Sequence, residues 1–140
     1  AARTRDFSEY LVAVAGLGDG PLGAPAGERI PLAYHDSCSA LRGLRVQEPQ
    51  RRLLRMLARY DLRELDEIGE CCGFGGHFSA DYPEVAGEVL ARKIAAIERT
   101  GARVVALDSP GCLLQIRGGL LKQGSPIEVK HIAELLAEAL

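Results

Sequence analysis

The chain has 140 residues, with 17 basic and 19 acidic side chains and a formal net charge of −2. A chain of this length buries roughly two-thirds of its unfolded surface, which is enough for one domain with its own core. The balanced charge excludes an extended basic surface for nucleic acid, and apolar runs such as 104–107 are too short to form a transmembrane segment.

Helical and strand patterns alternate along the chain. In chain order, the expected elements are a helix at 6–15, a loop at 16–28, a strand at 29–34, a helix at 48–60, an ambiguous segment at 62–69, a helix at 83–99, a strand at 102–108, a helix at 111–124, a strand at 126–130 and a helix at 131–140. Pro31 would weaken a central strand. Residues 62–69 fit a helical period, or a strand near 65–68. The alternation predicts an α/β fold with a mostly parallel sheet of about four strands, flanked by helices.

The four cysteines follow the predicted strands. Cys38 comes after the first strand, Cys71 and Cys72 after the second, and Cys112 after the third. Because the carboxyl ends of parallel strands share one edge, where ligands bind, we expect these thiols to converge there. In a cytosolic protein, a few cysteines of this kind more often bind metal or carry out redox chemistry than form a disulfide scaffold.

The adjacent cysteines lie in the glycine-rich stretch GECCGFGGHF, residues 69–78. Burial as small hydrophobic residues explains one or two cysteines, but explains poorly an adjacent pair in such a loop. The stretch lacks the Lys and Ser/Thr of a phosphate-binding loop. Structural zinc usually takes paired C-x-x-C motifs, whereas two neighbouring sulfurs fit different metal atoms of an iron–sulfur cluster better.

Several segments together resemble the cysteine-rich CCG domain that occurs in heterodisulfide reductases and in glycolate oxidase iron–sulfur subunits. These segments are YHDSCSALRGL, ECCGFGGHFS, TGARVVALDSPGCLLQIRGGL and KHIAELLAEAL. The sequence is most similar to the C-terminal half of the L-lactate utilisation (L-lactate dehydrogenase complex) iron–sulfur subunit. The resemblance implies that residues 1–140 are a single CCG domain, and that this domain is the C-terminal part of a longer two-domain chain.

The resemblance also implies a function and a ligand set. We expect an iron–sulfur electron-transfer domain with a [4Fe–4S] cluster on Cys38, Cys71, Cys72 and Cys112, in a complex that oxidises L-lactate or glycolate. Its partners would be other subunits of that complex, including a ferredoxin-like iron–sulfur subunit, with no nucleic acid and no transmembrane segment. The expected location is the cytoplasm, at the membrane periphery through those partners.

One departure from the family pattern bears on the cluster. Ser109 stands where the ideal pattern has a fifth cysteine, and serine is a poorer iron ligand than thiolate. Candidates for an extra ligand or for a position beside the thiols are Ser109, His35, His77 and His131. The alternative for each histidine is a purely structural role, as a strand-end or loop residue.

Two other functions remain open from the sequence. The first is a structural zinc-binding or subunit-docking module without redox activity, which the missing fifth cysteine favours. The second is a thiol–disulfide oxidoreductase that uses Cys71 and Cys72; a bridge between neighbours would be strained and therefore reducible. No C-x-x-C redox motif supports this second function.

Overall fold

A parallel sheet forms the centre of the computed structural model, which describes residues 4–17, 20–25 and 27–140. Within these residues the sheet has four strands in the order β2-β1-β3-β4, and every neighbouring pair is parallel. The strands are β1 (Ile30–His35), β2 (Tyr60–Arg63), β3 (Val104–Leu107) and β4 (Glu128–His131). The helices are α1 (Phe7–Ala13), the π-helical turn η1 (Ser39–Leu44), α2 (Glu48–Met56), α3 (His77–Asp81), α4 (Pro83–Arg99), α5 (Pro110–Lys122) and α6 (Ile132–Ala139). The predicted α/β fold is confirmed.

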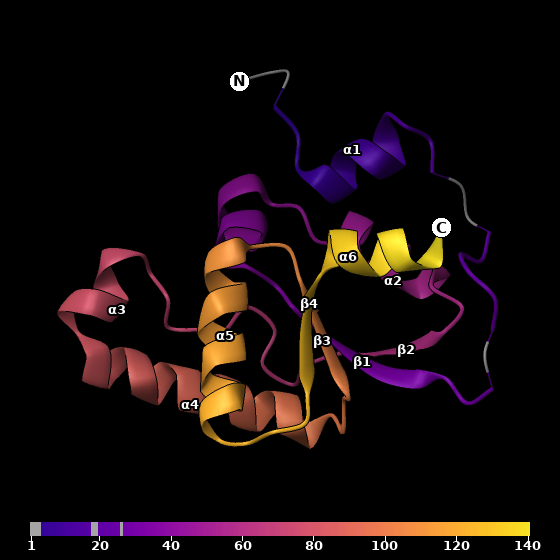
Figure 1. Cartoon of the computed structure of the whole chain (residues 1–140). Helices are drawn as coiled ribbons and strands as arrows, with labels where there is room; N and C mark the ends of the chain where they lie inside the picture. The colour runs from indigo at the N-terminus through magenta and orange to yellow at the C-terminus, as the bar shows by residue number, and fades with distance from the viewer. Residues whose placement is uncertain (1–3, 18–19, 26) are drawn as a thin grey trace.

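Helices cover both faces of the sheet (Figure 1). Because successive side chains of a strand point to opposite faces, Leu32 and Tyr34 of β1 pack with α2 and α6, whereas Ala33 packs with α4 and α5. Each face therefore has its own apolar cluster. His35 continues the alternation from Ala33 and is directed to the α4–α5 side.

The main helices and strands lie where the sequence pattern predicts them. Two details explain why the patterns work locally: Asp6 caps α1 through a capping box with Glu9, and Gly101, with φ +66°, follows the end of α4. Pro31 lies in β1, an internal strand, but β1 pairs with β3 only from Leu32 onward. Its missing N–H therefore costs no ladder hydrogen bond on that side.

Two features differ from the expected elements, and part of one expected loop lies outside the described residues. The second strand is Tyr60–Arg63, so it begins before the ambiguous segment and excludes residues 65–68. The short elements η1 and α3 have no counterpart in the sequence pattern, because single turns leave too few residues for a period. Residues 18–19 and 26 of the expected loop lie outside the described residues.

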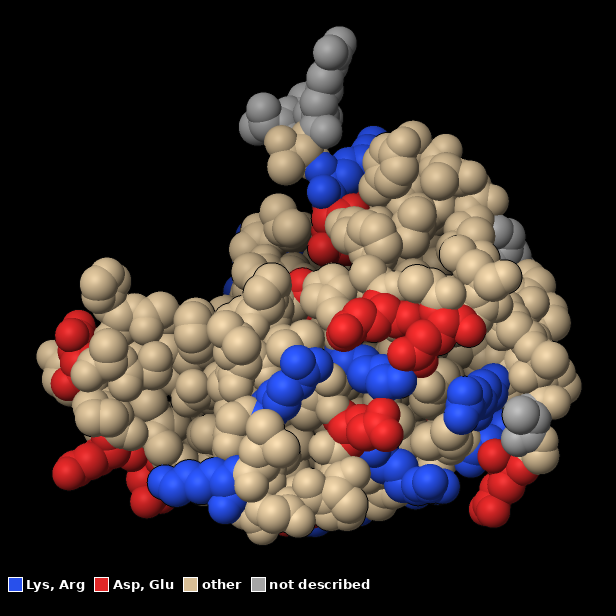
Figure 2. Space-filling view, viewed as in Figure 1, with Lys and Arg blue, Asp and Glu red and all other residues tan. Residues whose placement is uncertain are grey.

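The surface carries both signs of charge. Figure 2 shows acidic and basic side chains interspersed over one face, beside a largely uncharged area over α3 and α5. Exposed apolar side chains of α5 are Leu114 and Leu121.

Among the described residues, no helix has the length and apolar character needed to cross a membrane.

Candidate metal centre

The candidate site lies at the carboxyl edge of the sheet. Cys38 follows β1 directly and precedes the π-helical turn η1. Cys72 lies in the loop between β2 and α3, and Cys112 lies in the first turn of α5, just after β3. The cysteine-bearing segments therefore leave the sheet at the edge where parallel α/β folds bind ligands.

Three buried side chains meet at this edge. The sulfur atoms of Cys72 and Cys112 are 3.1 Å apart and share a hydrogen bond. A ring nitrogen of His35 joins them, so that the three possible ligand atoms all lie within 4.8 Å of one another. His35, Cys72 and Cys112 are 1%, 2% and 5% exposed. A nitrogen and two sulfurs at this spacing form a donor set suited to iron or zinc.

The two buried thiols do not ionise independently. The pKa of Cys72 is lowered to about 4, chiefly by its hydrogen bond with Cys112 and further by His35 and the backbone of Phe74, against the effect of burial. The same hydrogen bond, together with burial, raises the pKa of Cys112. One thiolate is therefore available at neutral pH, and a bound cation would favour the second one as well.

Two glycines allow the cysteine loop to approach the helices so closely. Gly73 has φ +82°, and a Cβ there would lie 2.5 Å from the backbone oxygen of Ala86 in α4. A Cβ on Gly111 would lie 2.5 Å from the ring of Phe74. These contacts hold the loop against α4 and α5 and place Cys72 beside Cys112. Gly73, in the cysteine-rich stretch, and Gly111, at the start of α5, thus have a role in packing.

The other two cysteines lie at the same edge but are exposed. The charge of Cys38 is close enough to Cys112 to contribute to the raised pKa of that thiol. The sulfur of Cys71 accepts a hydrogen bond from the N–H of Gly73, at 3.3 Å. The hydroxyl of Ser109 stabilises the thiolate of Cys112 through a hydrogen bond, which lowers the pKa of that thiol and opposes the larger effects. Ser109 therefore lies beside the cluster of thiols.

The three histidines separate into one at the site and two away from it. His77 is exposed at the start of α3. His131 caps α6, because its Nδ1 accepts the N–H of Ala133 at 3.2 Å. Only His35 belongs to the buried group with the thiols among the described residues. The alternation of side chains along β1 could have distinguished His35 from His77 and His131 in the sequence. It directs His35 to the same face of the sheet as the buried Ala33.

A buried ion pair supports the loop between His35 and Cys38. The guanidinium of Arg51 in α2 contacts both carboxylate oxygens of Asp36, at 2.9 and 2.7 Å, and also binds Glu64. These contacts, led by the hydrogen bond with Asp36, raise the pKa of Arg51. Because Arg51 lies on a separate helix, 15 residues further along the chain, no local sequence pattern indicates this partner of Asp36.

A second charged residue near the site was also missed. Lys93 of α4 is 1% exposed, and its Nζ donates to the backbone oxygen of Glu67 at 3.5 Å. Burial lowers the pKa of Lys93, while the charges of Glu70, Glu67 and Cys72 oppose that shift. A cation buried within electrostatic reach of Cys72 is suited to stabilise negative charge at the thiols.

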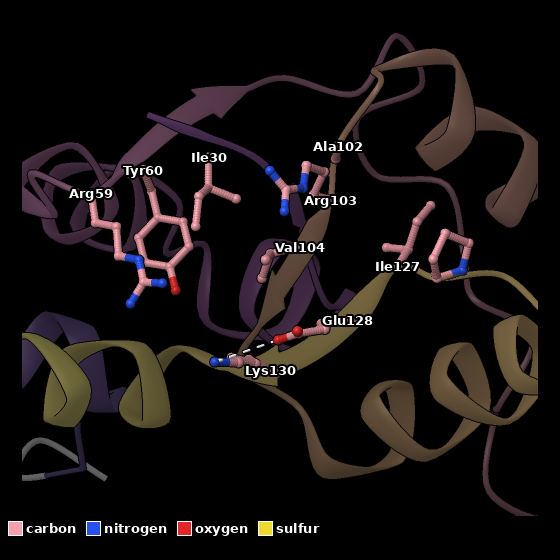
Figure 3. A pocket seen from close by; sticks show the side chains of 10 residues that line it. Ile30, Arg59, Tyr60, Ala102, Arg103, Val104, Ile127, Glu128 and Lys130 are labelled. Carbon is pink, nitrogen blue, oxygen red and sulfur yellow. Dashed lines mark ion pairs between the residues drawn. The ribbon is translucent and has the colours of Figure 1, made fainter. Parts of the chain in front are cut away.

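A hollow of about 370 Å³ lies at the opposite, amino edge of the sheet (Figure 3). It is lined by residues at or next to the first positions of the strands, including Ile30, Tyr60, Val104 and Glu128. None of the cysteines lines it. The hollow is therefore separate from the thiol site, and its mixed lining of arginine, glutamate and apolar groups points to no particular ligand.

Comparison with known proteins identifies the family. The family model described as CCG, cysteine-rich domain, matches residues 32–117, a range that contains all four cysteines. The chain is 36% identical over 136 residues to lactate utilization protein A 1 of Bacillus mycoides and 38% identical over 136 residues to lactate utilization protein A of Lysinibacillus sphaericus. It is 35% identical over 136 residues to the protein YkgE of Escherichia coli. Each match covers 97% of this chain and 54–58% of the relative, so the chain spans just over half the length of these curated relatives. The chain belongs to the cysteine-rich CCG-domain family.

Proposed function

We propose that this chain is an iron–sulfur electron-transfer domain of a system that oxidises a 2-hydroxy acid. The observation that carries the proposal is the buried group of Cys72, Cys112 and His35 at the ligand-binding edge of the sheet. Buried polar groups are normally paired in a folded protein. Two thiols in contact, with a buried imidazole nitrogen within 4.8 Å of both sulfurs, fit a metal group that all three side chains approach.

In this proposal the four thiols of Cys38, Cys71, Cys72 and Cys112 hold a [4Fe–4S] cluster, which supplies one-electron transfer when bound. Cys72 and Cys112 would hold its buried side, where the packed helices exclude water. The exposed residues Cys38 and Cys71 would hold the side nearest the solvent. An exposed side matters for the function, because electrons have to reach a partner protein from it.

The substrate class rests on the relatives rather than on the geometry. Proteins named lactate utilization protein A match nearly the whole chain, so we assign the domain to L-lactate oxidation ahead of glycolate oxidation. The domain would act in the cytoplasm as one part of a two-domain subunit and pass electrons to or from other iron–sulfur subunits. The largely uncharged surface over α3 and α5 (Figure 2) is a suitable approach for such a partner, because little charge has to be desolvated.

One specific observation favours a second candidate, a structural zinc site. His35, Cys72 and Cys112 offer three of the nitrogen and sulfur ligands that tetrahedral zinc takes, and the exposed Cys38, which interacts electrostatically with Cys112, would be the fourth. A thiol–disulfide function of Cys71 and Cys72 has no such support. Both are free thiols, and the sulfur of Cys72 contacts Cys112.

Anaerobic reduction of the purified protein tests the proposal. We expect a visible absorption band that bleaches on stepwise reduction, together with a paramagnetic state detected by electron paramagnetic resonance. The variant Cys72→Ser should lose both signals, whereas Ser79→Ala, a change in the exposed helix α3, should retain them. A protein that contains zinc and shows no reducible absorption would refute electron transfer and support the structural site.

A further inference from the structure

His35 is a buried histidine whose one hydrogen-bonding neighbour among the described residues is the sulfur of Cys72. Its side chain is 1% exposed, and apart from that sulfur neither Nδ1 nor Nε2 has a partner in the described part of the chain. Leaving a buried polar group unpaired costs about 1–3 kcal/mol, so native structures rarely retain one without a reason. Because at least one ring nitrogen is buried without a partner, packing alone does not explain a histidine at this position.

The backbone of β1 directs this ring toward the thiols. His35 is the last residue of β1 and pairs in register with Leu107 of β3, whose chain leads on to Cys112. Its side chain lies on the α4–α5 face, together with Cys72 and Cys112, and the three ligand atoms lie within 4.8 Å of one another. A ring nitrogen is therefore already located where the two sulfurs converge.

A supporting role through a hydrogen bond to sulfur is the main alternative. A histidine in that role donates an N–H to a thiolate, whereas a ligand binds the metal through a ring nitrogen; in both roles the other nitrogen normally has a polar partner. A hydrogen bond of His35 with the sulfur of Cys72 contributes to the lowered pKa of that thiol, and the second nitrogen of His35 has no partner among the described residues. Direct ligation explains why a ring nitrogen of His35 lies within 4.8 Å of both sulfurs, at a spacing suited to one metal group.

We infer that His35 is a direct ligand of the metal group at this edge, beside Cys72 and Cys112. The inference rests on the proposed function for the identity of the group, but not for the position of the ligand. With His35 included, the chain offers five donor side chains, although Ser109 replaces a cysteine of the family pattern. Replacement of a thiolate by a neutral imidazole lowers the negative charge of a cluster and raises its reduction potential, as histidine ligation does in Rieske centres.

Isotope labelling of histidine tests this ligand without any mutation. The anaerobically loaded, reduced wild-type protein is prepared with natural and with ¹⁵N-labelled histidine, and pulsed electron paramagnetic resonance measures nitrogen couplings. We expect a strong ¹⁴N coupling that changes to ¹⁵N on labelling. The coupling should disappear in His35→Ala and His35→Gln and persist in His77→Ala and His131→Ala, which serve as matched controls.

The outcomes separate this inference from the proposed function. A loaded cluster with no strong histidine coupling, or with a coupling that survives in His35→Gln, overturns the inference and leaves the iron–sulfur proposal intact. If the wild type binds no iron and sulfide, the proposed function fails, and Co²⁺ binding then decides the ligand. His35→Gln should weaken Co²⁺ affinity at least about tenfold relative to His77→Ala; equal affinities overturn the inference. Circular dichroism confirms that each variant is folded.

Discussion

Replacement of Arg51 by methionine should destabilise the domain strongly. Arg51 and Asp36 form a bidentate ion pair whose side chains are 8% and 4% exposed. The guanidinium also lies over the ring of Tyr34, 5.4 Å from its centroid. Methionine fills much of the same volume but leaves the carboxylate of Asp36 buried without its cation.

The expected cost follows from that unpaired charge. Removal of one partner of a buried ion pair costs about 3–5 kcal/mol, which is a large part of the roughly 5–15 kcal/mol that stabilises a typical domain. With a urea m-value of about 2 kcal/mol per M, the unfolding midpoint should fall by roughly 1.5–2.5 M. Urea titration of the metal-free protein, followed by far-ultraviolet circular dichroism, measures this shift.

Arg55→Met provides the matched control on the same helix. Arg55 pairs with Glu48 at 2.9 Å, but the two side chains are 56% and 72% exposed. An exposed pair of this kind is worth about 0.2–1 kcal/mol, so the midpoint should move little. The double variant with Arg51→Met and Asp36→Asn should recover part of the lost stability. Equal midpoints for Arg51→Met and Arg55→Met would refute the reasoning.

Two further substitutions test the packing and the charge around the thiols. Gly73→Ala should destabilise the domain by more than about 2 kcal/mol, because it adds a clash with Ala86 to the roughly 1–2 kcal/mol cost of a left-handed backbone. Gly124→Ala, at φ +68° with no atom near its Cβ, should incur only the backbone cost in the same denaturation assay. Lys93→Met should leave the metal-free domain equally or more stable, because a buried cation is removed. In the loaded protein the same change should lower the midpoint potential, on the order of tens of millivolts; an unchanged potential in a redox titration would contradict a role for this charge.

The sequence was most informative where a pattern extends over many residues. The helix at 83–99 and the strand at 102–108 could be predicted because several apolar side chains repeat with one period. The second strand could not be bounded, because Tyr60–Arg63 has four residues and closely follows an amphipathic helix. Tertiary pairing with β1 decides its position, and pairing is not visible in a local pattern.

For the candidate site, the sequence predicted the edge but not the arrangement of side chains. Topology places the cysteines at the carboxyl ends of the strands, whichever side chains point inward. The burial of Cys72 and Cys112 and the exposure of Cys38 and Cys71 depend on contacts between distant segments, such as Gly111 against Phe74. Arg51, which pairs with Asp36, lies on α2, and the buried Lys93 lies on α4. Contacts between distant segments also bring these two residues to the site, so a local sequence pattern does not predict them.

Metal and sulfide analysis of the anaerobically purified protein tests the central claim most directly. The account predicts equal molar amounts of iron and acid-labile sulfide in the wild type and the loss of both in Cys112→Ser. It also predicts no stoichiometric zinc, because the thiols are held by an iron–sulfur cluster. One zinc ion per chain without sulfide would contradict the electron-transfer function and identify the buried group as a structural metal site.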